Sequence, residues 1–330
     1  MARCTFIADE QAHQIAYFQD NLSDRTGHRD YPFLLKPEHR LDGLLSDVRN
    51  IAEALFSPDA LGIQWHTYIG HGRSSQACCL NFLMPLADKP ELLKRWLIRT
   101  LGIAPQAMLP VEKELAGAHR FIAFEYTGPG DRDYLDEAEG RVPQRGAHAT
   151  ASDAAVAYQD AAGKRHLVLI EWKYTEQYRN HKLSPDKGRK RHARYADKLV
   201  APHGPIRADL GLTLDDFLLE PFYQLVRQQM LAWQIEADLH SGFDTAMVLH
   251  LSPRGNRALH YMTAPAIAQA IERVGGVQTS DAFQAYRACL VQPHRYAQWY
   301  IEDAFSSLAD EPGASWYPQL KARYPSLCPA

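Results

Sequence analysis

The chain has 330 residues, of which 46% are hydrophobic and 23% are charged, a composition typical of a globular protein with one large domain or two modest ones. Its 36 basic and 39 acidic residues leave a formal net charge of −3, which excludes a polycation and confines any nucleic-acid surface to a local patch. The sequence holds no apolar run long enough for a membrane span, and its five cysteines follow no metal-binding spacing. We therefore expect a soluble, cytoplasmic protein in a reducing setting.

Helical periodicity marks the first hundred residues. The segment LDGLLSDVRNIAEALFS (41–57) has apolar residues at helical spacing and predicts an amphipathic helix. The pair Ser74–Ser75 is typical of an N-cap, and the helix that follows it should stop near Pro85. A third helix is predicted in ELLKRWLIRTLG (91–102), where the final glycine marks its end.

From residue 120 onward, the sequence pattern is typical of strands rather than helices. The segment RFIAFEYTG (120–128) is aromatic and β-branched, and a Gly-Pro-Gly turn closes it. The segments DAAVAYQ (153–159) and HLVLIEWKY (166–174) predict two further strands that are joined by a short turn. The three strands follow one another without an intervening helical pattern.

A helix and a fourth strand complete the ordered pattern. Pro221 precedes FYQLVRQQMLAWQIEADLH (222–240), a long helical segment, and TAMVLHLS (245–252) predicts a strand. We expect this strand to run parallel to 166–174, because a helical crossover joins the two. Three regions result, which are a helical N-terminal extension (1–73), a helix–three strands–helix–strand core (74–252), and a helical C-terminal extension packed on the core (253–330).

The chemistry of the chain centres on the end of the third strand. Glu171 and Lys173 share one face of that strand, because side chains alternate along it, and Trp172 takes the other face. A carboxylate within an apolar strand is costly unless something pairs with it. Lys173 alone would supply such a partner, so a structural ion pair is one interpretation of this motif.

The preceding hairpin suggests a second interpretation. If 161–163 forms a three-residue loop with a left-handed glycine, then Asp160 faces Lys164 and Asp153 lies opposite Glu171. Opposed residues have Cβ atoms about 4.5–5.5 Å apart, and like charges at that distance destabilise a sheet. A divalent cation between the two carboxylates would reverse the sign of that effect, and hard oxygen ligands suit Mg²⁺ or Mn²⁺.

A strand-borne Asp153, a hairpin and a Glu171-x-Lys173 strand together resemble the PD-(D/E)xK nuclease superfamily over residues 74–252. The flanks TASDAAVAY and LVLIEWKYTE are similar to a group of mostly uncharacterised bacterial members. The resemblance implies an α/β fold of the α+β kind, with a restriction-endonuclease-like αβββαβ core around a mixed central sheet. The chain departs from the pattern at Ser152, where a proline is usual.

The same resemblance implies the roles of the motif residues. Asp153, Glu171 and the backbone carbonyl of Trp172 would hold Mg²⁺ or Mn²⁺, and Lys173 would orient the attacking water. The implied activity is phosphodiester hydrolysis with nucleic acid as the partner. DNA is favoured over RNA, and endonuclease over exonuclease action. A homodimer is also implied, because cleavage of both strands commonly needs two sites.

Other residues carry weaker predictions. Glu125 is a further candidate metal ligand, or else an edge-strand carboxylate in water. The basic stretch 179–198 predicts contact with phosphates, or else a solvated loop. Polar residues after Pro221 would meet the substrate or support the site, or else form a plain solvent face. The candidate phosphate contacts are Lys187, Arg189, Lys190, Arg191 and Arg194, and the candidate supporting residues are Gln224, Arg227 and Gln228.

Alternative functions remain open. A catalytically silent nucleic-acid-binding module would keep the fold and use the basic stretch without a metal. A glycosidase would use two carboxylates, but it needs a sugar groove rather than a basic segment. His66 and His71 lie five residues apart without a clear third ligand, so they are interpreted as structural.

Overall fold

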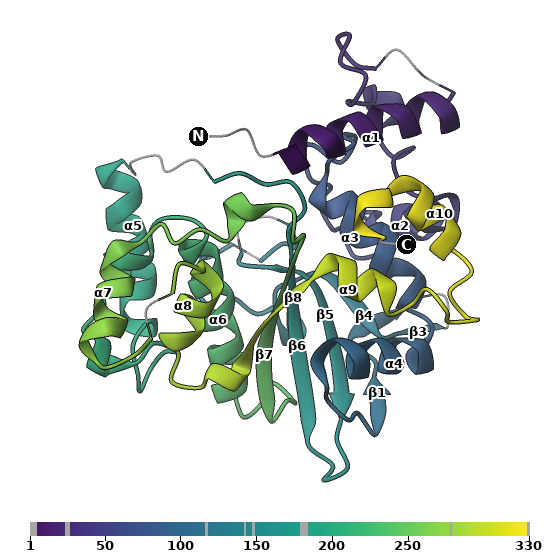
Figure 1. Ribbon diagram of the computed structural model, residues 1–330. Coiled ribbons are helices and arrows are strands. Elements are labelled where there is room, and N and C mark those ends of the chain that lie inside the picture. Colours follow the sequence, from purple (N-terminus) through teal and green to yellow (C-terminus); the bar gives the residue numbers. More distant parts are fainter. Residues whose placement is uncertain are drawn as a thin grey trace.

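In the computed structural model, residues 5–23, 27–115, 118–141, 143–146, 149–178, 184–277 and 279–328 are described. They form a mixed α/β fold in which a six-stranded sheet carries helices on both faces (Figure 1). The predicted mixed central sheet is confirmed. None of the helices in these ranges combines the length and apolar character needed to span a bilayer.

The central sheet has the order β1-β5-β6-β7-β8, and β4 pairs with β5 beside β1. β4, β5 and β6 are consecutive antiparallel strands, whereas β7 and β8 continue the sheet in parallel. The parallel pairing of β6 and β7 confirms the prediction made from the crossover. The strands are β1 (Ala107–Leu109), β4 (Ile122–Tyr126), β5 (Ser152–Gln159), β6 (Arg165–Trp172), β7 (Thr245–Ser252) and β8 (Tyr296–Tyr300), and a separate ribbon pairs β2 (Glu112–Leu115) with β3 (Ala118–Arg120).

The β5–β6 hairpin has the predicted three-residue loop. The Asp160 N–H donates to the Lys164 carbonyl over 3.0 Å, and Gly163 takes the left-handed conformation with φ of 81°. The Asp160 carboxylate also accepts the N–H groups of Ala162 and Lys164 at 2.9 Å each, so the loop conformation is fixed locally. The pairs run from Gln159 opposite Arg165 to Ala154 opposite Ile170. The next step of this register sets Asp153 opposite Glu171.

One face of the sheet packs against N- and C-terminal helices. Val156, Val168 and Trp172 point into this core, where the Trp172 ring lies 5.6 Å from that of Phe82 and 6.1 Å from that of Phe305. Residues from both ends of the chain therefore bury the back of β6. The helices that contribute to this core are α2 (Ser46–Phe56), α3 (Ser75–Leu83), α4 (Pro90–Leu101), α9 (Ile301–Ser306) and α10 (Tyr317–Arg323), with α1 (Thr5–Asn21) packed on α10.

The opposite face carries the crossover helix. Ala155, Leu167 and Leu169 pack against the apolar side of α6 (Phe222–Ala237). Around it lie α7 (Pro265–Arg273) and α8 (Ala282–Ala288), and α5 (Pro185–Tyr195) stands at the outer edge of this layer (Figure 1).

Two predictions about the chain outside the core are corrected. Residues 253–330 are not only helical, because β8 joins the central sheet beside β7. Its sequence YAQWY lacks a clean polar–apolar alternation, so no strand was predicted there. The basic stretch is not a loop where it is described, since residues 185–195 form α5, with Ser184 accepting the Lys187 N–H as N-cap. Residues 179–183 lie outside the described residues.

Candidate active site

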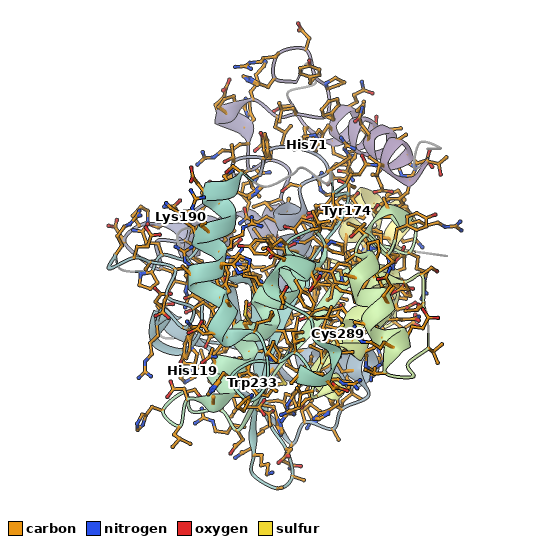
Figure 2. All side chains as sticks on the ribbon, turned by 90° about the vertical axis from the view of Figure 1, so that its left-hand side faces the viewer. His71, His119, Tyr174, Lys190, Trp233 and Cys289 are labelled. Carbon is orange, nitrogen blue, oxygen red and sulfur yellow. The ribbon has the colours of Figure 1, made fainter. Side chains whose placement is uncertain are left out.

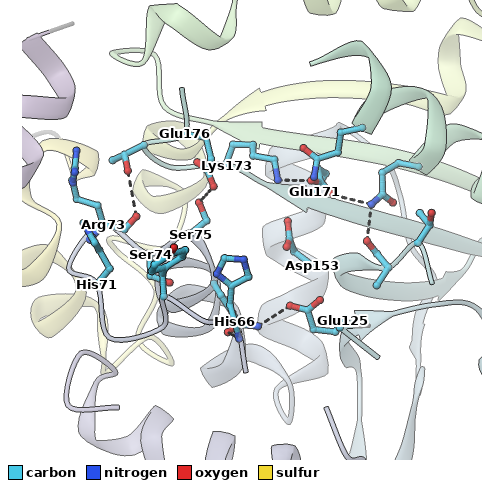
Figure 3. Close-up of a pocket in the computed structure, with 18 of the residues that line it drawn as sticks. His66, His71, Arg73, Ser74, Ser75, Glu125, Asp153, Glu171, Lys173 and Glu176 are labelled. Atoms are coloured by element: carbon cyan, nitrogen blue, oxygen red, sulfur yellow. Dashed lines mark hydrogen bonds and ion pairs between the residues drawn. The ribbon is translucent and has the colours of Figure 1, made fainter. Parts of the chain in front are cut away.

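A pocket of about 610 Å³ opens at the end of β6 where β5 begins. Its lining comes from α1, from residues 66–76, from the chain that enters β5, from the end of β6 with the residues after it, and from α6. Figure 3 shows Asp153, Glu171 and Lys173 close together in this pocket, with Glu125 at one end and His71 and Arg73 at the other.

Three carboxylates stand in one row across neighbouring strands. The register of β4 with β5 sets Glu125 opposite Asp153, and the register of β5 with β6 sets Asp153 opposite Glu171. Glu125 departs from regular strand geometry with φ of +48°, which is uncommon for a residue other than glycine. The sheet therefore gathers acidic residues that lie far apart in the sequence.

Asp153 binds the end of the neighbouring strand directly. Its Oδ2 accepts the Trp172 N–H at 2.6 Å, beyond the last backbone pair of the hairpin. In a strand the N–H and C=O of one residue point toward the same neighbour. The Trp172 carbonyl therefore faces the Asp153 side of the pocket, which is the position required of a backbone ligand.

Glu171 and Lys173 form an ion pair at the bottom of the pocket. Their Oε1 and Nζ atoms lie 2.5 Å apart, and the residues are only 2% and 7% exposed. Burial, together with repulsion by Asp153, raises the pKa of Glu171 to about 8 against the attraction of Lys173. Burial would lower the pKa of Lys173, but the charges of Glu171 and Asp153 outweigh it and raise that pKa.

The other two carboxylates of the row also resist ionisation. Burial raises the pKa of Asp153, with Lys173 opposing the rise. Burial and then repulsion by Asp153 raise the pKa of Glu125 to about 7, although its Oε1 accepts a hydrogen bond from Gln76 Nε2 at 2.7 Å. Glu125 is thus held by the protein rather than free in water.

These residues fit a hard divalent cation. Crowded, buried carboxylates that ionise poorly alone become favourable once a cation neutralises them, and oxygen donors of this kind suit Mg²⁺ or Mn²⁺. Within the described ranges no group of three or more His, Cys, Asp or Glu side chains is arranged to hold a metal ion. A site built here would consequently use Asp153 and Glu171, the Trp172 carbonyl and water. Glu125 as a direct ligand stays a prediction.

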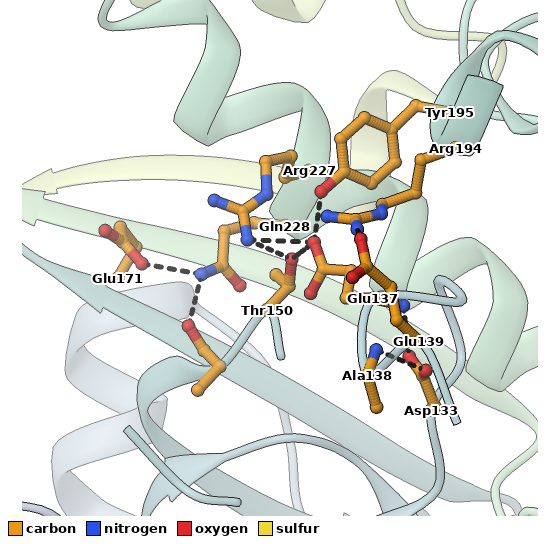
Figure 4. Close-up of polar contacts among 11 residues, drawn as sticks. Asp133, Glu137, Ala138, Glu139, Thr150, Glu171, Arg194, Tyr195, Arg227 and Gln228 are labelled. Carbon is orange, nitrogen blue, oxygen red and sulfur yellow. Dashed lines mark hydrogen bonds and ion pairs between the residues drawn. The ribbon is translucent and has the colours of Figure 1, made fainter. Parts of the chain in front are cut away.

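The polar side of α6 supports this row. Gln228 Nε2 donates to Glu171 Oε2 at 2.9 Å and to the Ala151 carbonyl at 2.7 Å, so it ties the chain entering β5 to the end of β6. Arg227 donates to Thr150 Oγ1 at 2.6 Å and to the buried Glu137 at 2.9 Å (Figure 4). Gln224 also lines the pocket. The alternative of a plain solvent face is therefore wrong for Arg227 and Gln228, and contact with a substrate stays a prediction.

The basic residues of α5 do not line the pocket. Lys187, Arg189 and Lys190 are exposed, and Lys190 lies on the outward side of the helix (Figure 2). Arg191 instead stacks on the Tyr223 ring at 3.5 Å, and Arg194 pairs with Glu139 at 2.6 Å. Three of the five predicted phosphate contacts are therefore on the open surface, and the other two are held by residues outside α5.

Several pocket residues were missed because the sequence gives no signal for them. His66 and His71, interpreted as structural, both line the pocket, as do Arg73 and Glu176. Burial and then the neighbouring Arg73 lower the pKa of His71 to about 4, so this imidazole is neutral at neutral pH. The spacing of the two histidines could not reveal that they share a pocket with strands some eighty residues later in the chain.

The raised carboxyl pKa values predict a pH effect on stability. Between about pH 4.5 and pH 8, Glu171 is ionised in the unfolded chain but protonated in the folded protein, because its pKa rises from the ordinary 4.5 to about 8. Folding therefore takes up a proton in this pH range. Without metal, the wild type should therefore lose stability relative to Glu171→Gln as pH rises through this window. Thermal melts in EDTA from about pH 5 to about pH 8.5 test this, and Mn²⁺ should stabilise the wild type more at the upper end, since ligands must be deprotonated. A melting difference that does not change with pH would contradict the assignment.

Comparison with known proteins adds one match. Residues 9–325 match a family described as "Restriction Endonuclease associating with ARP". No curated protein and no solved structure matches the chain.

Proposed function

Since the chain belongs to the family of restriction endonucleases associating with ARP, we propose that it is a nuclease that hydrolyses phosphodiester bonds, most readily in DNA, with Mg²⁺ or Mn²⁺ as its cofactor. One observation carries the proposal. Asp153, Glu171 and Lys173 line one pocket at the junction of an antiparallel hairpin and a parallel crossover, with Glu171 and Lys173 buried and Asp153 half-buried. With α4, β1 to β3 and α5 as insertions, the order α3, β4, β5, β6, α6 and β7 supports a PD-(D/E)xK core.

Asp153, Glu171 and Lys173 each have a distinct role in this reaction. Asp153 and Glu171 would hold the cation with the Trp172 carbonyl, and Gln228 would hold the Glu171 carboxylate in place through its hydrogen bond. When bound, the cation polarises the scissile phosphate and lowers the pKa of water. Lys173 would orient the attacking water and offset the negative charge that grows on the phosphate. One P–O bond forms to water, one ester P–O bond breaks, and the leaving oxygen takes a proton.

Incubation with different nucleic acids tests the proposal. Plasmid, linear duplex and single-stranded DNA and RNA of matched sequence would be incubated with Mg²⁺, Mn²⁺, Ca²⁺ or EDTA, and the products separated by electrophoresis. We expect cleavage of DNA with Mg²⁺ or Mn²⁺ and none in EDTA. Binding without cleavage under every condition would favour the silent binding module instead.

The exposed face of α5 makes a separate prediction about binding. Replacement of Lys187, Arg189 and Lys190 by Ala should weaken nucleic-acid binding at all sequences alike, because phosphate contacts carry no sequence information. The slope of log affinity against log salt should fall by about 0.9 for each lost contact with duplex DNA. Fluorescence anisotropy across a salt series measures both effects.

A charge-matched variant controls for the change in net charge. Arg99, Arg287 and Lys321 are exposed residues on α4, α8 and α10, and their replacement by Ala removes the same three charges. This control should leave the salt slope nearly unchanged. An equal loss of nucleic-acid affinity in the two triple variants would mean that α5 contributes to binding only through the net charge of the protein.

A further inference from the structure

One wall of the pocket is formed by residues 66–76, a short segment that carries aromatic and cationic groups. His66 and Tyr68 both line the pocket, and their ring centroids lie 6.1 Å apart at an angle of 55°. Tyr68 is 63% exposed, so its ring is accessible from solvent. Flat, accessible rings at the rim of a phosphate-cleaving pocket are suited to stack on a nucleobase.

This rim is held in place relative to the carboxylates. The Gln76 side chain accepts the His66 N–H at 3.0 Å through Oε1 and donates to Glu125 through Nε2. The backbone of the segment folds as successive turns, and its Gly72 lies so close to α1 that a Cβ there would come within 2.8 Å of Gln14. The rim is therefore preorganised rather than a loose loop.

Arg73 adds a cation on the same side. Its side chain lines the pocket, and its Nε is buried without a hydrogen-bond partner among the described residues. The Arg73 carbonyl accepts the Thr175 hydroxyl at 3.2 Å, which ties this residue to the chain that follows Lys173. A guanidinium of this kind suits a phosphate, because its planar fork matches the phosphate oxygens.

The walls of the pocket limit what can reach the carboxylates. Glu171 and Lys173 lie at its bottom, and Ile7 of α1, residues 149–151 and α6 close the other sides. Its volume of about 610 Å³ is that of a site that encloses a small ligand. In a duplex each base is paired and stacked between its neighbours, so its face is not available to the rings of His66 and Tyr68. A single strand has unstacked bases that can turn toward an aromatic ring.

We infer that the site takes single-stranded nucleic acid. A base stacks on the rim formed by His66 and Tyr68, and the phosphate beside the scissile one contacts Arg73. This inference rests on the proposed function and specifies its substrate class. Duplexes would be cut where a strand is already unpaired, as at a fork, flap or gap.

Binding measured apart from cleavage tests the inference. Anisotropy in Ca²⁺ would compare a labelled single strand with the duplex of the same sequence, for the wild type, Tyr68→Ala, Arg73→Gln and Tyr261→Ala. Tyr261 is the matched control, because it is also 63% exposed but lies outside the pocket. Tyr68→Ala should weaken single-strand binding by about 5- to 100-fold, the loss of one stacked base. Arg73→Gln should reduce the single-strand salt slope by about 0.7.

The outcomes separate the inference from the proposed function. Preferential single-strand binding that is lost in Tyr68→Ala but kept in Tyr261→Ala supports the inference, even if the wild type cleaves nothing and the nuclease proposal fails. Equal affinity for both substrates, or equal effects of the two tyrosine variants, overturns the inference. If the wild type then still cuts DNA with Mg²⁺, the nuclease proposal stands alone. Melting temperatures of all variants verify that these surface changes leave the fold intact.

Discussion

Asp153→Asn and Glu171→Gln should each lower the rate of Mg²⁺- or Mn²⁺-dependent cleavage by at least about 10³-fold. Each change removes a charged ligand from a cation that supplies several kcal/mol of transition-state stabilisation, and about 1.4 kcal/mol corresponds to a factor of ten in rate. Both variants should fold, because the amides keep the shape of the side chains and the amide oxygen introduced by Asp153→Asn can still accept the Trp172 N–H. Single-turnover cleavage of a labelled substrate measures the loss.

Thermal melts give a second readout that does not depend on activity. Mn²⁺ should raise the melting temperature of the wild type by mass action, and the rise should be lost in both variants. Glu272→Gln on α7 is the control, since it removes one exposed carboxylate far from the pocket. If Asp153→Asn kept both the Mn²⁺-dependent rise and the cleavage rate of the wild type, the metal site would lie elsewhere.

Lys173→Met should separate metal binding from catalysis. Turnover should fall by about 10²–10³-fold, the usual cost of removing one group that stabilises transition-state charge. The Mn²⁺-dependent rise in melting temperature should persist, because Lys173 pairs with Glu171 and is not among the residues that would hold the ion. Loss of the ammonium that opposes the raised pKa of Glu171 should raise that pKa further, so full Mn²⁺ stabilisation should need a higher pH.

Turnover and melting profiles at several pH values test both parts of this prediction. Lys321→Met, an exposed substitution on α10, is the matched control and should leave both measurements unchanged. A Lys173→Met variant that cleaves at the wild-type rate would show that the Glu171–Lys173 pair is only structural, which is the alternative interpretation of the motif. A variant that loses the Mn²⁺ effect at every pH would instead make Lys173 essential for assembling the site.

The sequence alone determined the hairpin that carries the site. Its register depends on residues close together in the chain, since Asp160, Gly163 and Lys164 close a short loop whose geometry sets every later pair. Alternation along each strand then put Asp153, Glu171 and Lys173 on one face and Trp172 in the core. The sequence was sufficient to predict this hairpin, because the geometry of the turn fixes the register and side chains alternate between the two faces of each strand.

The tertiary structure alone decided what surrounds that hairpin. Glu125 joins the acidic row because β4 pairs with β5 across a long connection, whose length leaves the register of the pair undetermined by local rules. Residues 66–76 reach the pocket through α1 and Gln76, contacts between segments far apart in the chain. The helix α5 has almost no apolar residues to mark it, and contacts with distant segments, such as Arg191 and Tyr195 against Tyr223 of α6 and Arg194 with Glu139, place it on the fold. These contacts depend on the pairing and packing of segments far apart in the chain. The hydrophobic periodicity of a short stretch of sequence does not predict them.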